Sequence, residues 1–234
     1  MAYDRELALA REAAMAAGGN ALRIRAAGLS PKIKPDGSPV TAADLDNERL
    51  LRGLIEEAFP HDGILGEEGT RKPGDSGRRW ILDPIDGTRD FVRGDPAWCV
   101  LIALEDGGEP VVGVAHFPML DETYWASRGQ GAYRNGEPFT LSDPLPKETV
   151  DFLSHLWIVR GFGQPPVQSP AREDGDVWFE RRGELWDLAP VQVIIEEAGG
   201  RYFAPDGSRR NNAGRAFACT PALEPRVKAF LGLA

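Results

Sequence analysis

The segment from residue 83 to residue 88 carries the residue types best suited to chemistry in this chain. It reads Asp-Pro-Ile-Asp-Gly-Thr and follows the apolar run Trp80-Ile81-Leu82, so two carboxylates stand three residues apart at the end of an expected strand. Divalent cations such as Mg²⁺ prefer oxygen ligands. Phosphate groups bind backbone N–H groups, often at a helix N-terminus, and the Gly87-Thr88 turn offers them. The segment therefore indicates phosphoryl chemistry assisted by Mg²⁺.

Three further acidic residues can complete such a site. Glu67 and Glu68 follow the apolar run Ile64-Leu65-Gly66, and Asp187 precedes an expected helix as its N-cap. A glutamate pair is usually a solvated surface feature, but beside a second acidic strand end it becomes a plausible half of one metal cluster. An N-cap carboxylate can still turn one oxygen outward toward a cation.

Composition and charge narrow the class of protein. The chain has 234 residues, enough for one large domain or two small ones, and a net charge of −9, which argues against a nucleic-acid-binding surface. Its N-terminus lacks the basic and then apolar pattern of a signal peptide, and no stretch is long and apolar enough to span a bilayer. We expect a cytoplasmic protein with no membrane attachment. We expect Cys99 to be a buried hydrophobe, and the three histidines, at 61, 116 and 155, to be structural.

The hydrophobic pattern predicts helices alternating with many short strands. Helices are expected over 4–27 with a break at Gly18-Gly19, over 42–58 with Thr41 as cap, over 188–198 and over 225–232. The buried face of the second helix is expected to carry Leu45, Leu50, Leu51, Leu54 and Ile55. Strands are expected over 64–66, 80–82, 99–104, 111–116, 122–126, 156–159, 177–179 and 216–220, with a hairpin at Asn135-Gly136. The short turns favour an antiparallel sheet, and a boundary near 141–150 separates two expected subdomains, 1–142 and 143–234.

Four sequence blocks, taken together, resemble those of a known enzyme family. They are Asp36-Gly37-Ser38-Pro39-Val40-Thr41-Ala42-Ala43-Asp44, Gly66-Glu67-Glu68, residues 80–88, and Trp186-Asp187-Leu188-Ala189 running into Glu197-Ala198-Gly199-Gly200. With them, and with Gly129-Gln130-Gly131-Ala132 and Asn135-Gly136, the chain resembles the inositol monophosphatase family of Mg²⁺-dependent phosphatases over nearly its whole length. Residues 91–94, Trp98 and 101–104 look most like the bacterial histidinol-phosphatase branch. The haloacid-dehalogenase phosphatases are disfavoured, because their motif places two aspartates two residues apart and here they are three apart.

The resemblance implies a fold and a set of residue roles. The fold would be of the α+β or α/β class, a layered α/β/α/β/α sandwich of two subdomains with the site between them. Two or three Mg²⁺ ions would be held by Glu67, Asp83, the Ile85 carbonyl, Asp86 and Asp187. The backbone N–H groups of Gly87 and Thr88 would bind the phosphate, with Lys34 nearby. Asp44 and Thr88 would orient the attacking water, with Glu67 also catalytic, and Glu180 would contact the substrate.

The predicted activity is Mg²⁺-dependent hydrolysis of a small polyol phosphate. Inositol monophosphate is the first expectation and histidinol phosphate the alternative, and the family resemblance also implies a homodimer. Substrate choice stays open because the region 145–171 is shortened and proline-rich where relatives usually carry a helix. A non-catalytic binding or regulatory protein on the same fold is the alternative from a different class. The presence of every metal and water-positioning residue disfavours it.

Overall fold

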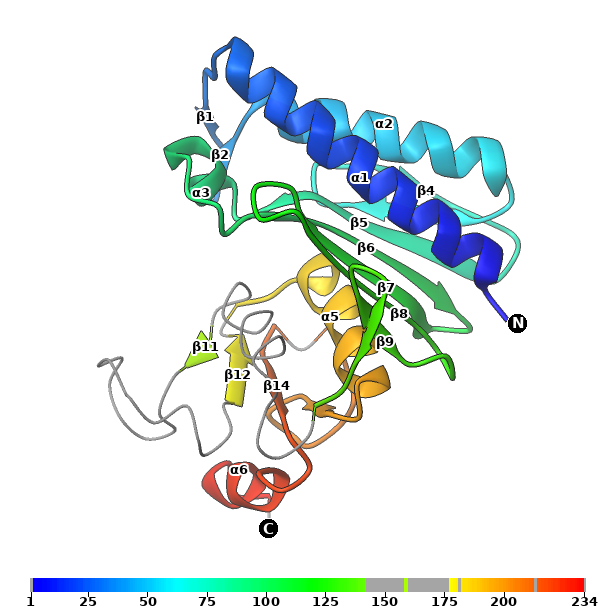
Figure 1. Ribbon diagram of the computed structural model, residues 1–234, viewed down its shortest axis with the longest axis vertical. Helices are drawn as coiled ribbons and strands as arrows, with labels where there is room; N and C mark the ends of the chain where they lie inside the picture. Colours follow the sequence, from blue (N-terminus) through cyan, green and yellow to red (C-terminus); the bar gives the residue numbers. More distant parts are fainter. Residues whose placement is uncertain (1, 142–157, 160–176, 181, 213, 234) are drawn as a thin grey trace.

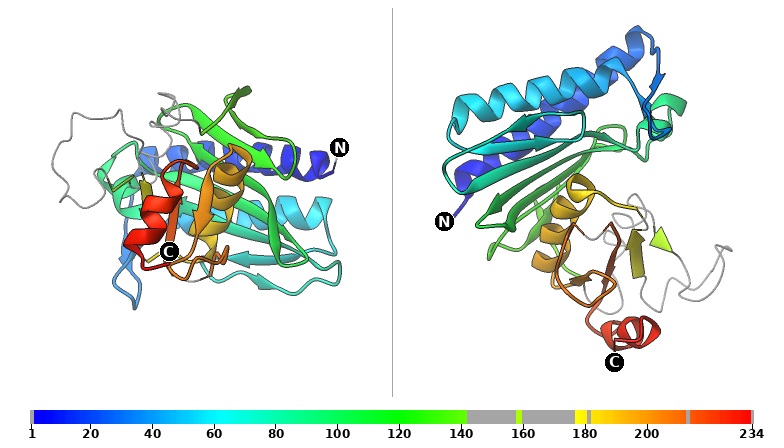
Figure 2. Two further views of the ribbon diagram at one scale, coloured as in Figure 1. Left: turned by 90° about the horizontal axis from the view of Figure 1, so that it is seen from below. Right: turned by 180° about the vertical axis from the view of Figure 1, so that it is seen from behind.

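The described part of the chain is arranged in five layers. The computed structural model describes all residues except 1, 142–157, 160–176, 181, 213 and 234. In Figure 1, α1 (Asp4–Ala27) and α2 (Ala42–Ala58) cover one face of an eight-stranded sheet, and α5 (Leu185–Glu197) covers the other. A four-stranded sheet packs on α5, and α6 (Glu224–Phe230) lies beyond it. The predicted α/β/α/β/α sandwich is confirmed, and the right-hand view in Figure 2 shows the same layers from behind.

The large sheet brings two acidic strand ends to the same edge. Its order is β10-β9-β8-β7-β6-β5-β3-β4, and the neighbours are antiparallel except for β3 and β5, which are parallel. Because parallel strands end on the same side of a sheet, Glu67 after β3 comes next to Asp83 on β5. The strands are β3 (Gly63–Gly66), β4 (Arg71–Lys72), β5 (Arg78–Asp86), β6 (Cys99–Asp106), β7 (Glu109–Phe117), β8 (Glu122–Ser127), β9 (Ala132–Arg134) and β10 (Glu137–Phe139).

Several strand predictions are confirmed and others fall short. Asn135 and Gly136 both have positive φ and join β9 to β10, as the hairpin signal predicts. The strand expected over 80–82 is too short, because β5 continues through the acidic segment to Asp86. The second sheet has the order β11 (Ile158–Val159), β12 (Val177–Glu180), β14 (Ala216–Cys219), β13 (Arg201–Phe203), of which β13 was not predicted. The small hairpin of β1 (Lys32–Ile33) and β2 (Pro39–Val40) and the helix α3 (Thr88–Arg93) were not predicted either.

The predicted boundary between subdomains lies almost wholly outside the described residues. The structure describes residue 141 and then omits 142–157, so the proposed division at 142/143 falls in the omitted segment. The proline-rich segment 165–171 is also outside the described residues.

Helix α1 runs unbroken through Gly18-Gly19, so the predicted break is wrong. Gly18 is buried, and a Cβ atom placed there would lie 2.6 Å from Pro118 and 2.7 Å from His116. Because Gly18 has no side chain, the helix can approach the end of β7 closely. Gly19 is exposed, and a Cβ there would meet nothing within 4 Å.

Helix α2 begins as predicted but buries a different face. Thr41 is the N-cap, and its hydroxyl accepts a hydrogen bond from the Ala43 N–H at 3.1 Å. Leu51 and Ile55 are buried as expected, but Leu45 is 45% exposed, which contradicts the prediction. In the first half of the helix the buried residues include the polar Asp44, Asn47 and Glu48, because this end faces the acidic edge of the sheet rather than its apolar centre.

Helix α5 lies directly against β7. A Cβ atom at Gly113 of β7 would lie 2.3 Å from the Pro190 carbonyl oxygen, so the close contact requires glycine there. The helix starts one turn earlier than predicted, with Glu184 as N-cap, and the assignment of Asp187 as the N-cap is wrong. Asp187 is the third helical residue and closes a capping box by accepting a hydrogen bond from the Glu184 N–H at 2.7 Å.

Candidate active site

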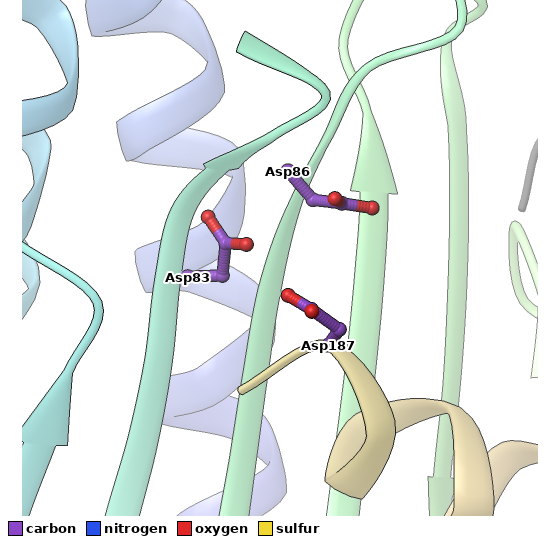
Figure 3. A group of neighbouring side chains, drawn as sticks. All are labelled: Asp83, Asp86 and Asp187. Atoms are coloured by element: carbon purple, nitrogen blue, oxygen red, sulfur yellow. The ribbon is translucent and has the colours of Figure 1, made fainter. Parts of the chain in front are cut away.

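Three aspartates converge where β5 meets the start of α5. Asp83, Asp86 and Asp187 each place a carboxylate oxygen so that the three atoms lie within 4.8 Å of one another. Figure 3 shows the side chains pointing toward one another, two from β5 and one from the first turn of α5. Carboxylate oxygens at this spacing are the donor set that hard divalent cations prefer.

A β-bulge lets Asp83 and Asp86 share this site. Asp83 pairs with Leu101 and Asp86 with Cys99, so β5 uses three residue steps where β6 uses two. On a regular strand, residues three apart point to opposite faces of the sheet. The extra residue removes that conflict, and the Ile85 N–H donates to Asp83 Oδ1 at 2.9 Å within the bulge.

Two glutamates and a lysine lie beside the aspartates. Lys34 Nζ lies 2.8 Å from Glu67 Oε1 and 2.6 Å from Glu68 Oε1. Burial alone would lower the pKa of Lys34, but the two carboxylates outweigh it and raise that pKa. Lys34 is therefore charged and compensates part of the negative charge.

The remaining charge makes the cluster costly without a cation. Burial, followed by the charges of Glu67, Asp86 and Asp187, raises the pKa of Asp83 well above its usual range. Burial and the charge of Glu67 likewise raise the pKa of Asp86 to about 7. The pKa of Asp187 is also raised, by burial and then by Asp86. A divalent cation would remove the repulsion that raises these pKa values and would bind the ionised carboxylates. The cluster therefore fits a site for divalent cations.

Asp44 and Thr88 form a hydrogen-bonded pair next to this cluster. The Thr88 hydroxyl lies 3.1 Å from Asp44 Oδ1 and 3.1 Å from the Ile85 carbonyl oxygen, so it can donate to either. The other oxygen of Asp44 accepts from the N–H and the hydroxyl of Thr41. Burial raises the pKa of Asp44. A hydroxyl and a buried carboxylate in series can orient a water molecule and receive its proton.

A pocket of about 300 Å³ opens over these groups. The residues that line it are Asp36, Ser38, Pro39, Glu67, Asp83, Ile85, Asp86, Gly87, Thr88, Arg89, Asp90, Glu184, Trp186 and Asp187. Gly87 has φ of 82° and precedes α3, a left-handed conformation that favours glycine. Its position brings the start of α3 to the pocket wall, where backbone N–H groups can reach a phosphate.

Most residues predicted for the site line this pocket. Asp44 is joined to it through Thr88, and Lys34 through Glu67. Glu180 is not among the lining residues, but its charge contributes to the raised pKa of Asp86. Their chemical roles stay predictions. Sequence reasoning missed Glu184, although an acid three residues before Asp187 was the available signal.

The prediction that Cys99 is buried is confirmed, and the two histidines in the described residues do not line this pocket. Cys99 is buried, with its Sγ 3.8 Å from Asp86 Oδ2. His116 is buried with Nδ1 2.9 Å from the Thr123 hydroxyl, and His61 pairs with Asp75 on the surface. His155 lies outside the described residues.

Comparisons with known proteins agree with this geometry. The profile of the inositol monophosphatase family matches residues 3–158. The histidinol-phosphatase of Chlorobaculum parvum is 41% identical over 73% of this chain and 74% of its own. That of Mycobacterium tuberculosis is 35% identical over 88% of this chain and 90% of its own. Among solved structures, the extragenic suppressor protein suhB from Bartonella henselae has a TM-score of 0.79 and 27% identity, covering 97% of this chain and 98% of its own.

The family profile covers the pocket residues from Asp36 to Asp90, and the structural similarity to suhB covers nearly the whole chain. The family and the two histidinol-phosphatases act on phosphate monoesters, and the acidic cluster suits the metal dependence of the family. The protein is accordingly a phosphoric monoester hydrolase, and the chain belongs to the inositol monophosphatase family.

Proposed function

We propose that this protein hydrolyses a small phosphorylated metabolite with Mg²⁺, and that histidinol phosphate is its substrate. The observation that carries the proposal is the gathering of carboxylates from β3, β5 and α5 around one pocket, with the Asp44–Thr88 pair beside it. A site of this composition has little use in a protein that only binds a neutral ligand.

We assign the metal-holding role to Glu67, Asp83, Asp86, Asp187 and the Ile85 carbonyl, with two or three Mg²⁺ ions. When bound, Mg²⁺ supplies Lewis acidity that activates water and offsets the charge on the phosphate and the leaving oxygen. The assignment is supported by the excess of acidic over basic side chains in the pocket, which a bound divalent cation would offset.

The remaining roles follow from position. The Thr88 hydroxyl donates to Asp44 while its oxygen accepts from the attacking water, which aligns the water for an in-line approach to phosphorus. As the water attacks, its proton passes to the Thr88 oxygen while the Thr88 hydroxyl proton passes to Asp44. The backbone N–H groups of Gly87 and Thr88 bind phosphate oxygens, and Lys34 holds Glu67 in place.

Two observations favour histidinol phosphate over inositol monophosphate, which is the first expectation from the sequence. The relatives at 41% and 35% identity are histidinol-phosphatases. In addition, three acids that are not assigned metal ligands line the pocket, namely Asp36, Asp90 and Glu184. Glu180 is close enough for its charge to help raise the pKa of Asp86. Histidinol phosphate carries a cationic amine, which such groups would attract, whereas inositol is uncharged.

The test is phosphate release from histidinol phosphate, inositol monophosphate and glycerol phosphate, each with and without Mg²⁺. We expect Mg²⁺-dependent release that is fastest from histidinol phosphate and lost in Asp83→Asn. Faster release from inositol monophosphate would overturn the substrate assignment alone. Mg²⁺ binding without release from any substrate would instead favour the non-catalytic binding protein.

Two charge-removing variants locate the amine subsite. Glu184→Gln and Glu180→Gln should each raise KM for histidinol phosphate by about ten-fold and leave KM for glycerol phosphate nearly unchanged, because one charged hydrogen bond of the order of 1.5 kcal/mol is lost. Equal changes for both substrates would contradict this subsite.

We also propose that the enzyme works in the cytoplasm, as its sequence pattern suggests, and that it is a homodimer, as the family resemblance implies. In the described part of the chain, no helix has the length and apolar content needed to cross a membrane. Size-exclusion chromatography with light scattering tests the dimer directly.

A further inference from the structure

We propose that Glu48 is a positioning residue that holds the turn from Glu67 to Thr70 and thereby sets the affinity of the metal site. The inference rests on the proposed function, since it concerns a ligand assigned there. Glu48 lies on α2 and is 4% exposed. Its Oε2 accepts from the Glu68 N–H at 2.7 Å, and its Oε1 accepts from the Thr70 N–H at 2.7 Å.

Both oxygens of this carboxylate are needed for the contact. An amide side chain offers one acceptor oxygen and one NH₂ group, so a glutamine at 48 would turn a donor toward one of the two N–H groups. Leaving a partly buried N–H without an acceptor is unfavourable. The turn would then move away from α2.

Gly66 makes room for the Glu48 carboxylate. A Cβ atom at Gly66 would lie 2.2 Å from Glu48 Oε2 and 2.5 Å from its carboxyl carbon. Any side chain at 66 would therefore push the carboxylate away from the turn. Strand β3 and α2 meet at this point because position 66 has no side chain.

The contact fixes the backbone on both sides of Glu67. The N–H of Glu67 donates to the Leu82 carbonyl at 3.1 Å, and the next N–H along the chain donates to Glu48. The turn is closed by a hydrogen bond of 2.9 Å from the Gly66 N–H to the Thr70 carbonyl. Glu67 is thus held between the neighbouring strand β5 and helix α2, and its side chain reaches the pocket.

The same helix face also reaches the other acidic segment. Residues four apart lie on one side of a helix, and Asp44 contacts Thr88 while Glu48 contacts the turn. Between them, the Asn47 amide nitrogen lies 3.5 Å from the Pro84 carbonyl. Helix α2 therefore fixes the segment after β3 relative to the segment that carries Asp83 and Asp86.

A second glutamate provides a matched control. Glu197, at the far end of α5, accepts from the N–H groups of Gly129 and Gly131 at 2.9 Å each, in the turn between β8 and β9. Its chemistry is the same, with one oxygen for each of two N–H groups, but neither glycine lines the acidic pocket. If Glu48 contributed only to stability, its replacement would change the Kd for Mg²⁺ no more than the replacement of Glu197 does.

The experiment compares Glu48→Gln, Gly66→Ala and Glu197→Gln with the wild-type protein. Calorimetric titration with Mg²⁺ in the absence of substrate should show a Kd raised about 10- to 100-fold in Glu48→Gln and Gly66→Ala and changed by less than about two-fold in Glu197→Gln. Amide hydrogen exchange at residues 68 and 70 should speed up in the first two variants. High Mg²⁺ should restore most of their kcat, because every assigned ligand and the Asp44–Thr88 pair are still present.

The outcomes separate this proposal from the proposed function. A wild-type Kd for Mg²⁺ retained in both Glu48→Gln and Gly66→Ala would overturn the positioning role alone. A similar loss of affinity in Glu197→Gln would overturn it as well, since the effect would then be general. Absence of Mg²⁺ binding by the wild-type protein would overturn the proposed function and this inference together. Should Glu48→Gln fold poorly, Gly66→Ala displaces the same carboxylate while leaving it in the chain.

Discussion

The Thr88 hydroxyl oxygen lies 3.1 Å from Asp44 Oδ1, while Thr41 occupies the other oxygen of Asp44 with two hydrogen bonds. Asp44 is buried completely, so Thr88 links it to the pocket. Neither residue belongs to the cluster of three aspartates. If these residues have the proposed roles, proton transfer and metal binding depend on different side chains, and each can be removed without the other.

Replacing Asp44 with asparagine should lower kcat about 10²- to 10⁴-fold, because an amide cannot take up the proton. The Kd for Mg²⁺ should stay close to that of the wild-type protein, since Asp44 is not among the assigned metal ligands. Steady-state phosphate release and calorimetry measure the two quantities. Thr88→Ser keeps the hydroxyl and should retain most of the activity, whereas Thr88→Ala should lose it. Loss of Mg²⁺ binding in Asp44→Asn would show that the two functions are not separate.

Asp83→Asn should abolish activity and yet stabilise the protein in the absence of metal. Burial and the charges of Glu67, Asp86 and Asp187 all disfavour the Asp83 carboxylate, and a neutral amide removes that cost. A gain of about 1 kcal/mol corresponds to a rise in Tm of about 2–4 °C for a protein of this size. Differential scanning fluorimetry with and without Mg²⁺ measures it.

The control for that prediction is Asp75→Asn, which removes a carboxylate from an exposed pair with His61. It should leave Tm nearly unchanged. A lower Tm for metal-free Asp83→Asn would mean that the wild-type carboxylate is favourable in the empty pocket, against the electrostatic argument.

Mg²⁺ affinity should increase from about pH 6 to about pH 8, because protons compete with the cation for carboxylates whose pKa is raised. Burial and the charge of Glu67 raise the pKa of Asp86 to about 7. Without metal, such a group keeps its proton in the folded protein at a pH where it is ionised in the unfolded chain. Its contribution to stability is present below the usual carboxylate pKa near 4 and is lost as pH rises through about 7.

The increase in Tm caused by Mg²⁺ should consequently be larger at the higher pH. Thermal melts across that range, with and without Mg²⁺, measure the difference. A metal-induced shift independent of pH would show that the carboxylates are already ionised at the lower pH.

The glycine pair of α1 gives a stability prediction with a built-in control. Gly18→Ala should destabilise the protein by about 1–3 kcal/mol, because the new methyl group would overlap His116 and Pro118. Gly19→Ala meets open space and should stabilise the helix by about 0.5–1 kcal/mol. Urea denaturation of both variants measures the two values. Equal effects would mean that α1 does not approach β7 as closely as the structure has it.

Features encoded over a few neighbouring residues could be predicted from the sequence. The Thr41 cap, the Asn135-Gly136 hairpin and the strand that ends before Glu67 depend on local residue types and spacing, and the structure has all of them. The separate roles of the acids were implied by the family resemblance alone, and they stay predictions.

Features that depend on distant partners were missed. Nothing near Gly18 in the sequence reveals that His116 would pack against it, so helix propensity alone predicted a break. The apolar spacing in α2 predicted a buried Leu45, but that end of the helix faces a polar site. Glu48 binds backbone N–H groups 20 and 22 residues away in the sequence. Sequence pattern alone places a glutamate in a helix on the solvent side, so its buried position was missed.

The bulge in β5 makes residue count, as well as residue identity, a determinant of this site. Deleting one residue between Asp83 and Asp86 would restore a regular strand pairing with β6 while every acidic side chain remained in the sequence. Both carboxylates would keep their partners on β6 and one common face, but the bulge would be lost. With it would go the local geometry in which the Ile85 N–H donates to Asp83 and the Ile85 carbonyl lies 3.1 Å from the Thr88 hydroxyl. Within relatives of this chain, length changes at 83–86 should therefore be far rarer than exchanges of the intervening side chains.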